Sequence, residues 1–259
     1  RLDQYLWPFY QQDLQEEALT QGEAWELLLS LWIKFMENVG TRSKETVFQN
    51  LTLGGQDTCG RDQSNALSAL CLDATVALRT NQPALSVRWH PNIDPTFWAR
   101  VHTALAEGLG MPALFNDEVI LPALTSHGVA PEDAIGYGIV GCVEASIPGQ
   151  EQGVTAGGHI NLAKALELAL NDGRSTLTGV QIGLRTGDPR QFRGFDDLWQ
   201  AYVTQVEYLA GLNILATHIA GEEQKRSGHC PLMSSLLDDC LVRRRDLVCG
   251  GTRYNLPGI

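Results

Sequence analysis

Cys142 and Glu144 are the residues of this sequence whose types and spacing most directly suggest chemistry. The thiol and the carboxyl group lie two positions apart, after the apolar residues 136–140 and before a loop with Pro148 and Gly149. Side chains two apart on an extended chain point to the same side, so both groups could act on one small substrate. The same spacing also fits a buried thiol that packs as a small apolar side chain beside a solvated acid. The pair is therefore a hypothesis for an active site that needs support from the rest of the chain.

Short strands separated by helices are expected to position this pair. Several apolar runs are too short for helices and are bounded by Pro, Gly, Asn or Asp, which is typical of buried strands. Thr20, Asp94 and either Asn116 or Asp117 are placed to cap helices. This alternation predicts an α/β fold in which loops at strand ends carry the function. The predicted strands cover residues 47–53, 85–89, 111–115 and 136–140, and the predicted helices cover residues 14–37, 62–78, 95–110 and those that follow Asn116.

The last third of the sequence is expected to be mainly helical. Its predicted helices cover residues 159–170, 195–220 and 230–242, and a loop rich in Gly, Arg and Asp spans residues 183–194. The sequence contains no internal repeat and no Pro-rich linker. Residues 1–259 are therefore expected to form a single structural unit.

The composition is that of a globular protein that does not bind nucleic acid. The 259 residues are 44% hydrophobic, and 30 acidic residues against 19 basic ones give a formal charge of -11. Such a charge repels the phosphate backbone. No apolar stretch approaches the roughly 20 residues that span a bilayer, so a cytoplasmic protein without membrane contact is expected. Six cysteines without a CxxC pair indicate reduced thiols and predict no metal site.

The segment from Gly141 to Glu144, with Pro148 and Gly149 shortly after it, resembles the cysteine loop of glycyl radical enzymes, in particular of the dehydratase and lyase branch. Other short segments resemble this family in the same order along the chain. Together they cover nearly the whole sequence, and their order and spacing make the resemblance specific. These segments are residues 2–5, 31–34, 48–55, 112–117, 161–164, 236–240 and 250–255.

The resemblance implies a fold and several partners. The chain would be part of a ten-stranded α/β barrel with surrounding helices, incomplete at both ends. Residues 1–259 would be the central portion of that barrel domain, with the cysteine loop but without the C-terminal glycine-radical domain. The chain would bind no cofactor directly, because the radical glycine is installed by a separate activating enzyme that uses S-adenosylmethionine and an iron–sulfur cluster. A small-molecule substrate and, for the full-length protein, a homodimer are also implied.

The resemblance further implies roles for single residues. Cys142 would carry a transient thiyl radical that abstracts hydrogen from the substrate, and Glu144 would assist elimination or bond cleavage as acid or base. Phe48 and Thr155 stand where choline-lyase-like members line the substrate pocket, and they fit a core aromatic and a loop hydroxyl equally well. Ala156 stands where glycerol dehydratases carry an acid that binds the diol, so glycerol is not the expected substrate.

Three alternatives remain. A formate acetyltransferase of the pyruvate formate-lyase type would use two adjacent loop cysteines, whereas Gly141 precedes Cys142 here. A conventional cysteine hydrolase or acyltransferase would use Cys142 and Glu144 with His159 as the base. A non-catalytic remnant or scaffold would keep the fold alone. The Arg-Val-x-Gly-Tyr type of radical motif does not occur in these residues, so the expectation is that this chain is inactive on its own.

Overall fold

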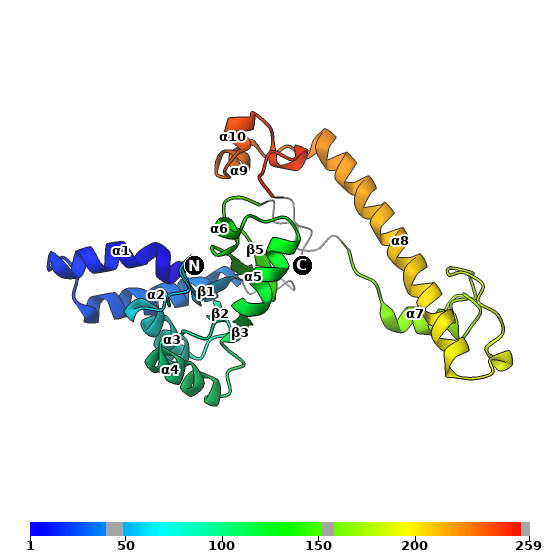
Figure 1. Cartoon of the computed structure of the whole chain (residues 1–259), viewed down its shortest axis with the longest axis horizontal. Coiled ribbons are helices and arrows are strands. Elements are labelled where there is room, and N and C mark those ends of the chain that lie inside the picture. The colour runs from blue at the N-terminus through cyan, green and yellow to red at the C-terminus, as the bar shows by residue number, and fades with distance from the viewer. Residues whose placement is uncertain (40–48, 152–157, 255–259) are drawn as a thin grey trace. The chain divides into compact units, whose positions relative to one another are not determined.

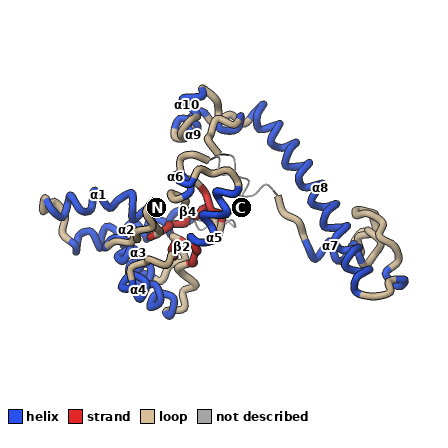
Figure 2. Tube along the Cα trace, in the orientation of Figure 1, coloured by secondary structure: helices blue, strands red, loops and turns tan. Residues whose placement is uncertain are grey.

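A computed structural model gives the fold of the chain and describes residues 1–39, 49–151 and 158–254. Strands and helices alternate in the first part and helices dominate the later part, which confirms the predicted α/β class (Figures 1 and 2). The chain divides into two compact units, Arg1–Thr155 with Thr252–Ile259, and Ala156–Gly251. The single unit of residues 1–259 stays a prediction, because the compactness of each unit does not test how the two act together.

The first unit contains the parallel sheet and the helices that cover it. Its elements are α1 (Leu2–Gln15), α2 (Gln21–Val39), β1 (Asn50–Gly54), α3 (Ala66–Leu78), β2 (Ala84–Trp89), α4 (Pro95–Ala106), β3 (Ala113–Asn116), α5 (Asp117–Ser126), α6 (Pro131–Ala134), β4 (Gly138–Val140) and β5 (Glu144–Ser146). The second unit is helical. Its elements are α7 (Leu162–Ala169), η1 (Pro189–Gln191), α8 (Phe195–Ser227), α9 (Pro231–Ser235), α10 (Cys240–Arg243) and η2 (Leu247–Cys249).

Local capping signals determine where several helices begin. Thr20 and Glu23 form a reciprocal capping box at the start of α2, in which the Thr20 amide donates to Glu23 Oε2 at 2.8 Å. Asp94 caps α4 and Asn116 caps α5, as the sequence predicts. The helix expected over residues 14–37 begins too early, because α1 ends at Gln15 and α2 begins at Gln21. The caps satisfy amide groups that would otherwise lack partners, so these boundaries follow from the sequence.

β1, β2 and β3 form a parallel sheet with β2 in the centre. Thr52 on β1 lies opposite Ser86 on β2, and Arg88 on β2 lies opposite Phe115 on β3. α3 connects β1 to β2, and α4 connects β2 to β3. Because side chains alternate along a strand, each strand presents one set of residues to each face of the sheet.

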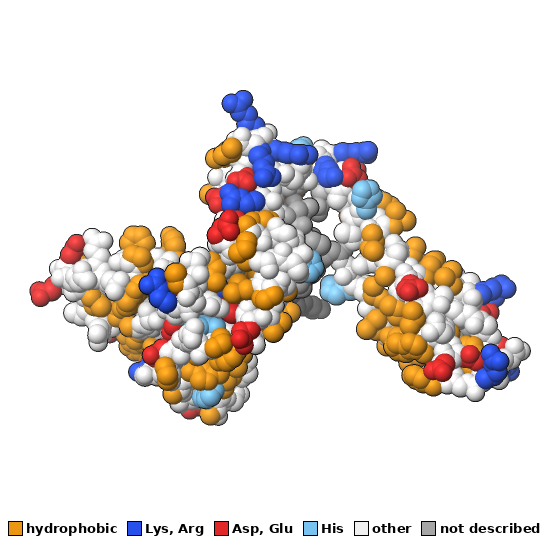
Figure 3. Space-filling view, in the orientation of Figure 1, with side chains coloured by type: hydrophobic (Ala, Val, Ile, Leu, Met, Phe, Trp, Pro, Cys, Tyr) orange, Lys and Arg blue, Asp and Glu red, His pale blue; other side chains and the backbone are white. Residues whose placement is uncertain are grey.

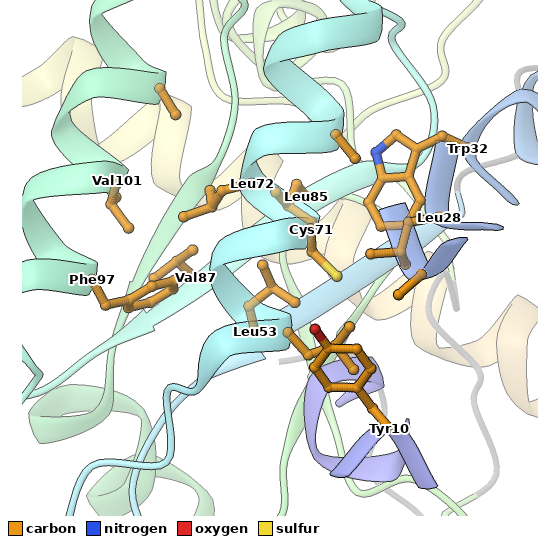
Figure 4. Packing of buried hydrophobic residues seen from close by; sticks show 14 of the residues in the cluster. Tyr10, Leu28, Trp32, Leu53, Cys71, Leu72, Leu85, Val87, Phe97 and Val101 are labelled. Atoms are coloured by element: carbon orange, nitrogen blue, oxygen red, sulfur yellow. The ribbon is translucent and has the colours of Figure 1, made fainter. Parts of the chain in front are cut away.

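One face of this sheet is apolar and packs against helices. Leu53, Leu85 and Val87 are fully buried or nearly so, and burial of each stabilises the fold by about 1.5–3 kcal/mol. Figure 4 shows these strand residues beside side chains of the neighbouring helices. The helical partners in this cluster include Tyr10, Leu28, Trp32, Cys71, Leu72, Phe97 and Val101. This cluster is the main core of the first unit.

The opposite face of the sheet is polar. Asn50 and Thr52 on β1, with Ser86 and Arg88 on β2, alternate with the apolar residues of the core face. Thr52, Ser86 and Arg88 are buried nonetheless. Buried polar groups need hydrogen-bonding partners, so the elements that cover this face must supply them.

Arg88 and Asp117 form a fully buried ion pair on this polar face. Arg88 Nε and Nη2 donate to the two carboxylate oxygens of Asp117, both at 2.8 Å. Arg88 Nη1 donates to the carbonyl oxygens of Ile135 and Tyr137 at 2.9 and 3.0 Å. The guanidinium also lies 3.8 Å from the centroid of the Tyr137 ring, whose hydroxyl donates to Asp117 at 2.7 Å. The pair thereby ties β2 and the start of α5 to the chain segment that enters β4.

β4 and β5 differ from the predicted strand pattern. The sequence predicts a strand over residues 136–140 in the same series as the others, whereas β4 pairs antiparallel with β5 in a separate two-stranded sheet. The helix expected over residues 230–242 is also wrong, because α9 and α10 are separate. Asp239 adopts a φ of 68°, a left-handed conformation that a continuous helix does not contain.

In the second unit, α7 packs against α8. The buried side chain of Gln205 on α8 donates to the Leu184 carbonyl oxygen at 2.6 Å and accepts the Leu184 amide at 3.1 Å, which holds the loop before η1. Figure 3 shows apolar side chains gathered over α7 and α8. They line a surface cavity of about 350 Å³, formed by Leu162, Ala163, Leu166, Phe195, Leu198, Trp199 and Tyr202.

None of the helices in residues 1–39, 49–151 and 158–254 combines the length and the apolar character needed to cross a membrane.

The Arg88–Asp117 pair makes a stability prediction. Arg88→Met should lower the free energy of unfolding of the chain by about 3–5 kcal/mol, because Asp117 would remain buried without its cation. The matched control is Arg100→Met, whose partner Asp73 is exposed, and its loss should stay within about 1 kcal/mol. Urea unfolding followed by circular dichroism measures both. Equal losses in the two variants would contradict a structural role for the buried pair.

Candidate active site

Cys142 lies at the tip of a β-hairpin, called here the Cys142 hairpin, which consists of β4, a turn at residues 141–143, and β5. Gly138 pairs with Ser146, and Val140 pairs with Glu144, so Glu144 is the first residue after the turn. Cys142 is exposed and carries a free thiol. A thiol at a hairpin tip is accessible to a substrate and to a neighbouring chain segment.

The turn, rather than an extended strand, brings Glu144 to Cys142. Glu144 Oε2 accepts the backbone amide of Cys142 at 2.9 Å and that of Val143 at 3.0 Å. The expectation that Cys142 and Glu144 lie on one side of an extended chain is therefore wrong. The chain reverses at Gly141, whose φ of 63° is a left-handed conformation that glycine adopts without strain.

The same two hydrogen bonds control the ionisation of Glu144. The amides of Val143 and Cys142 stabilise the carboxylate and hold the pKa of Glu144 below its ordinary value, although partial burial opposes them. The group is therefore ionised at neutral pH and starts as a proton acceptor. Both bonds use Oε2.

Two side chains of β1 attach the Cys142 hairpin to the polar face of the sheet. The buried amide of Ile139 on β4 donates to Thr52 Oγ1 at 2.8 Å. Asn50 Nδ2 donates to the carbonyl oxygen of Gly141 at 3.3 Å, immediately before Cys142. No functional role was predicted for Asn50 or Thr52 from the sequence. Their alternation with Leu51 and Leu53 is the signal that could have identified them as a buried polar face.

An apolar cluster supports the base of the Cys142 hairpin. Tyr137, Ile139 and Ile147 are almost fully buried. They pack with residues of α5, α6 and their connection, namely Leu124, Val129 and Ala134. Arg88 holds the carbonyl oxygen of Tyr137, as described above. Packing and hydrogen bonds together therefore fix the backbone on which Cys142 is presented.

The other residues named from the sequence fall outside the described residues or in the second unit. Phe48, Thr155 and Ala156 lie outside the described residues, so their roles stay predictions. His159 lies in the second unit, where it lines a surface cavity of about 290 Å³ with residues that include Lys164 and Asn213. A hollow of about 360 Å³ in the first unit is lined by residues of α1, β1 and β4, but Cys142 is not among its lining residues.

Comparison with known proteins connects the whole chain to one group of enzymes. The family model described as "Pyruvate formate lyase-like" matches residues 1–259. The chain is 36% identical over 264 residues to the trans-4-hydroxy-L-proline dehydratase of Clostridioides difficile, covering 98% of this chain and 33% of that protein. It is 33% identical over 257 residues to the isethionate sulfite-lyase of Nitratidesulfovibrio vulgaris, covering 95% of this chain and 31% of that protein.

A solved structure confirms the relationship of the fold. The glycerol-bound form of the B12-independent glycerol dehydratase from Clostridium butyricum superposes with a TM-score of 0.91 and 35% identity, over 99% of this chain and 33% of that chain. The barrel-type fold expected from the sequence is confirmed, and the three parallel strands in the described residues are an open part of it. The chain spans about a third of the length of the relatives it matches.

Thr52 provides a test of how the Cys142 hairpin is held. Thr52→Val keeps the shape of the side chain but leaves the buried amide of Ile139 without an acceptor, which should lower the free energy of unfolding by about 1–3 kcal/mol. Hydrogen exchange at the Ile139 amide should also accelerate. Thr52→Ser retains the hydroxyl and should retain most of the protection. Unchanged exchange at Ile139 in Thr52→Val would show that this bond does not hold the hairpin.

Proposed function

The chain belongs to the pyruvate formate lyase-like family, and we propose that it is the part of a glycyl radical dehydratase or lyase that presents Cys142 and Glu144 to a small substrate. Its relatives include a dehydratase and a sulfite-lyase, so the general enzyme type is that of glycyl radical eliminating enzymes. The observation that carries the proposal is the turn itself. The hydrogen bond from the backbone amide of Cys142 to the Glu144 carboxylate supports a proton acceptor next to this residue.

The exposed tip of the Cys142 hairpin fits a radical relay. A glycyl radical on another segment would supply the unpaired electron by taking the hydrogen atom of the thiol. An activating enzyme that uses S-adenosylmethionine and an iron–sulfur cluster is proposed to install that radical, and a homodimer is proposed for the full-length protein. The Cys142 hairpin contributes position, since hydrogen-atom transfer requires contact between the sulfur and one C–H bond of the substrate.

Cys142 and Glu144 would then act in sequence. The Cys142 thiyl takes a hydrogen atom from a carbon that bears a hydroxyl group, which regenerates the thiol and leaves the unpaired electron on that carbon. The Glu144 carboxylate accepts the hydroxyl proton, and the leaving group departs from the adjacent carbon with its bonding electron pair; when it leaves as hydroxide, it takes the proton from Glu144 and forms water. The Cys142 thiol then returns a hydrogen atom to the product radical, which regenerates the thiyl. The lowered pKa of Glu144 keeps the group ionised, so it can accept a proton, but it also makes the carboxylate a weaker base; the proposed role rests on its position.

The substrate is proposed to be small and hydroxylated. Glycerol, which occurs in the name of a similar structure, carries hydroxyl groups on adjacent carbons, as these steps require. Trans-4-hydroxy-L-proline, in the name of a relative, carries one ring hydroxyl, which would itself be the leaving group after hydrogen abstraction from a neighbouring carbon. Phe48 and Thr155 are proposed to line the pocket, with Phe48 two residues before Asn50 of β1. The formate acetyltransferase alternative would need a second cysteine at position 141, where this chain has glycine.

The test uses the complete gene product that contains this chain, activated under anaerobic conditions. Cys142→Ser should retain the glycyl radical signal in electron paramagnetic resonance but lose turnover. Glu144→Gln should also retain the signal and should lower kcat by roughly 10²–10⁴-fold, the usual contribution of a positioned acid or base. Cys59→Ser, which changes another exposed cysteine, is the control and should leave turnover unchanged. Turnover by Cys142→Ser at the wild-type rate would refute the relay.

A further inference from the structure

The space beside Gly141 is occupied by the carboxylate of Glu144. A Cβ built at Gly141 would lie 2.7 Å from Glu144 Oε2, 3.4 Å from Cδ and 3.5 Å from Oε1. The first distance is shorter than a van der Waals contact permits. Glu144 Oε2 is the same atom that accepts the amides of Cys142 and Val143. The position that holds the carboxylate is therefore the position that a side chain at residue 141 would fill.

We propose that Gly141 is a positioning residue for Glu144, because a side chain at position 141 and an amide-bound carboxylate at position 144 exclude each other. This inference rests on the proposed role of Glu144 as the base. It assigns to Gly141 a function beyond the left-handed turn, since a residue such as Asn can adopt that backbone but cannot leave the space empty.

The carboxylate, and not the backbone, would yield to a new side chain. The carbonyl oxygen of Gly141 is held by Asn50, and the adjacent strand β4 is held by Thr52. Glu144 begins β5 and pairs with Val140, so its backbone is also fixed. Its carboxylate is the end of a flexible side chain. A substitution at Gly141 would therefore leave the Cys142 hairpin in place but push the carboxylate off the two amides.

The exclusion links residue 141 to the type of reaction. A loop with two adjacent cysteines, as in the acetyltransferase alternative, places a thiol side chain at position 141. Such a side chain would fill the space that Glu144 Oε2 occupies in this chain. The turn can therefore carry either a second thiol or a placed carboxylate, and Gly141 selects the carboxylate. Elimination requires this proton acceptor, whereas transfer of an acyl group between two thiols does not.

Gly149 offers a matched control. Gly149 also has a left-handed backbone, with a φ of 80°, and follows β5 by three residues. A Cβ built at Gly149 meets no atom within 4 Å. Gly149→Ala therefore introduces similar backbone strain without displacing the carboxylate. Any difference in effect between Gly141→Ala and Gly149→Ala therefore measures the effect of displacing the Glu144 carboxylate, apart from backbone strain.

The first measurement needs no turnover. In the 259-residue chain labelled with ¹³C at glutamate side chains, Glu144→Gln identifies the Glu144 carboxyl resonance. Gly141→Ala should raise the titration midpoint of this resonance towards the ordinary glutamate value and accelerate hydrogen exchange at the Cys142 and Val143 amides. Gly149→Ala should change neither. An unchanged midpoint and unchanged exchange in Gly141→Ala would overturn the proposal, as would equal changes in both alanine variants.

The second measurement uses the activated complete gene product. Gly141→Ala should lower kcat about 100-fold with little change in KM and with the glycyl radical signal retained, because a misplaced group of this kind costs about that much. Gly149→Ala should stay near the wild-type rate. If the resonance and exchange results hold but turnover does not depend on Glu144, the proposed function fails while the exclusion stands. If turnover depends on Glu144 but Gly141→Ala keeps the wild-type kcat, the positioning role fails instead.

Discussion

The side chains of Arg88 and Asp117 are both fully buried, so each charge must keep the other as its partner. This requirement constrains the first unit. Arg88 Nη1 donates to the carbonyl oxygens of Ile135 and Tyr137, in the segment that enters β4. Arg88 stacks on Tyr137, and the Tyr137 hydroxyl closes the network on Asp117, while burial raises the pKa of that hydroxyl and keeps it a donor. The backbone before β4 can move only if several buried hydrogen bonds break together. The placement of Cys142, five residues after Tyr137, therefore begins with this network.

The two faces of the sheet have different roles: the apolar face packs in the main core, and the polar face holds the Cys142 hairpin. Leu53, Leu85 and Val87 on one face pack against helices and supply the main core (Figure 4). The other face carries Asn50, Thr52 and the other polar residues that hold the Cys142 hairpin. In an α/β barrel the helices cover the outer face of the sheet, and the face away from them points to the interior. The polar face of this chain thus corresponds to the interior side of such a barrel.

The turn at residues 141–143 exposes Cys142 and also binds the Glu144 carboxylate. Gly141 provides the left-handed backbone and the free space, and Cys142 is exposed at the tip. The Glu144 carboxylate accepts the backbone amides of Cys142 and Val143, which helps to lower its pKa. The same residues therefore determine the shape of the turn and the protonation state of the proposed base.

Local signals in the sequence determined much of the fold. The strand at residues 84–89 and the helix starts at Asp94 and Asn116 are encoded by neighbouring residues, because apolar alternation and capping act over a few positions. Cys142 and Glu144 were selected from the sequence through a family resemblance. The comparisons confirm that family, but the roles of the two residues stay proposals.

Only the tertiary structure decided how the Cys142 hairpin is held and which way Glu144 points. The bond from Asn50 to Gly141 joins residues 91 positions apart, and the bond between Thr52 and Ile139 joins residues 87 positions apart. Local spacing carries no information about such partners, and a Cys-x-Glu pattern fits a strand as well as a turn. The sequence therefore determined which groups are present, whereas long-range packing decided which of them meet, because a buried polar group takes whichever partner the fold brings within reach.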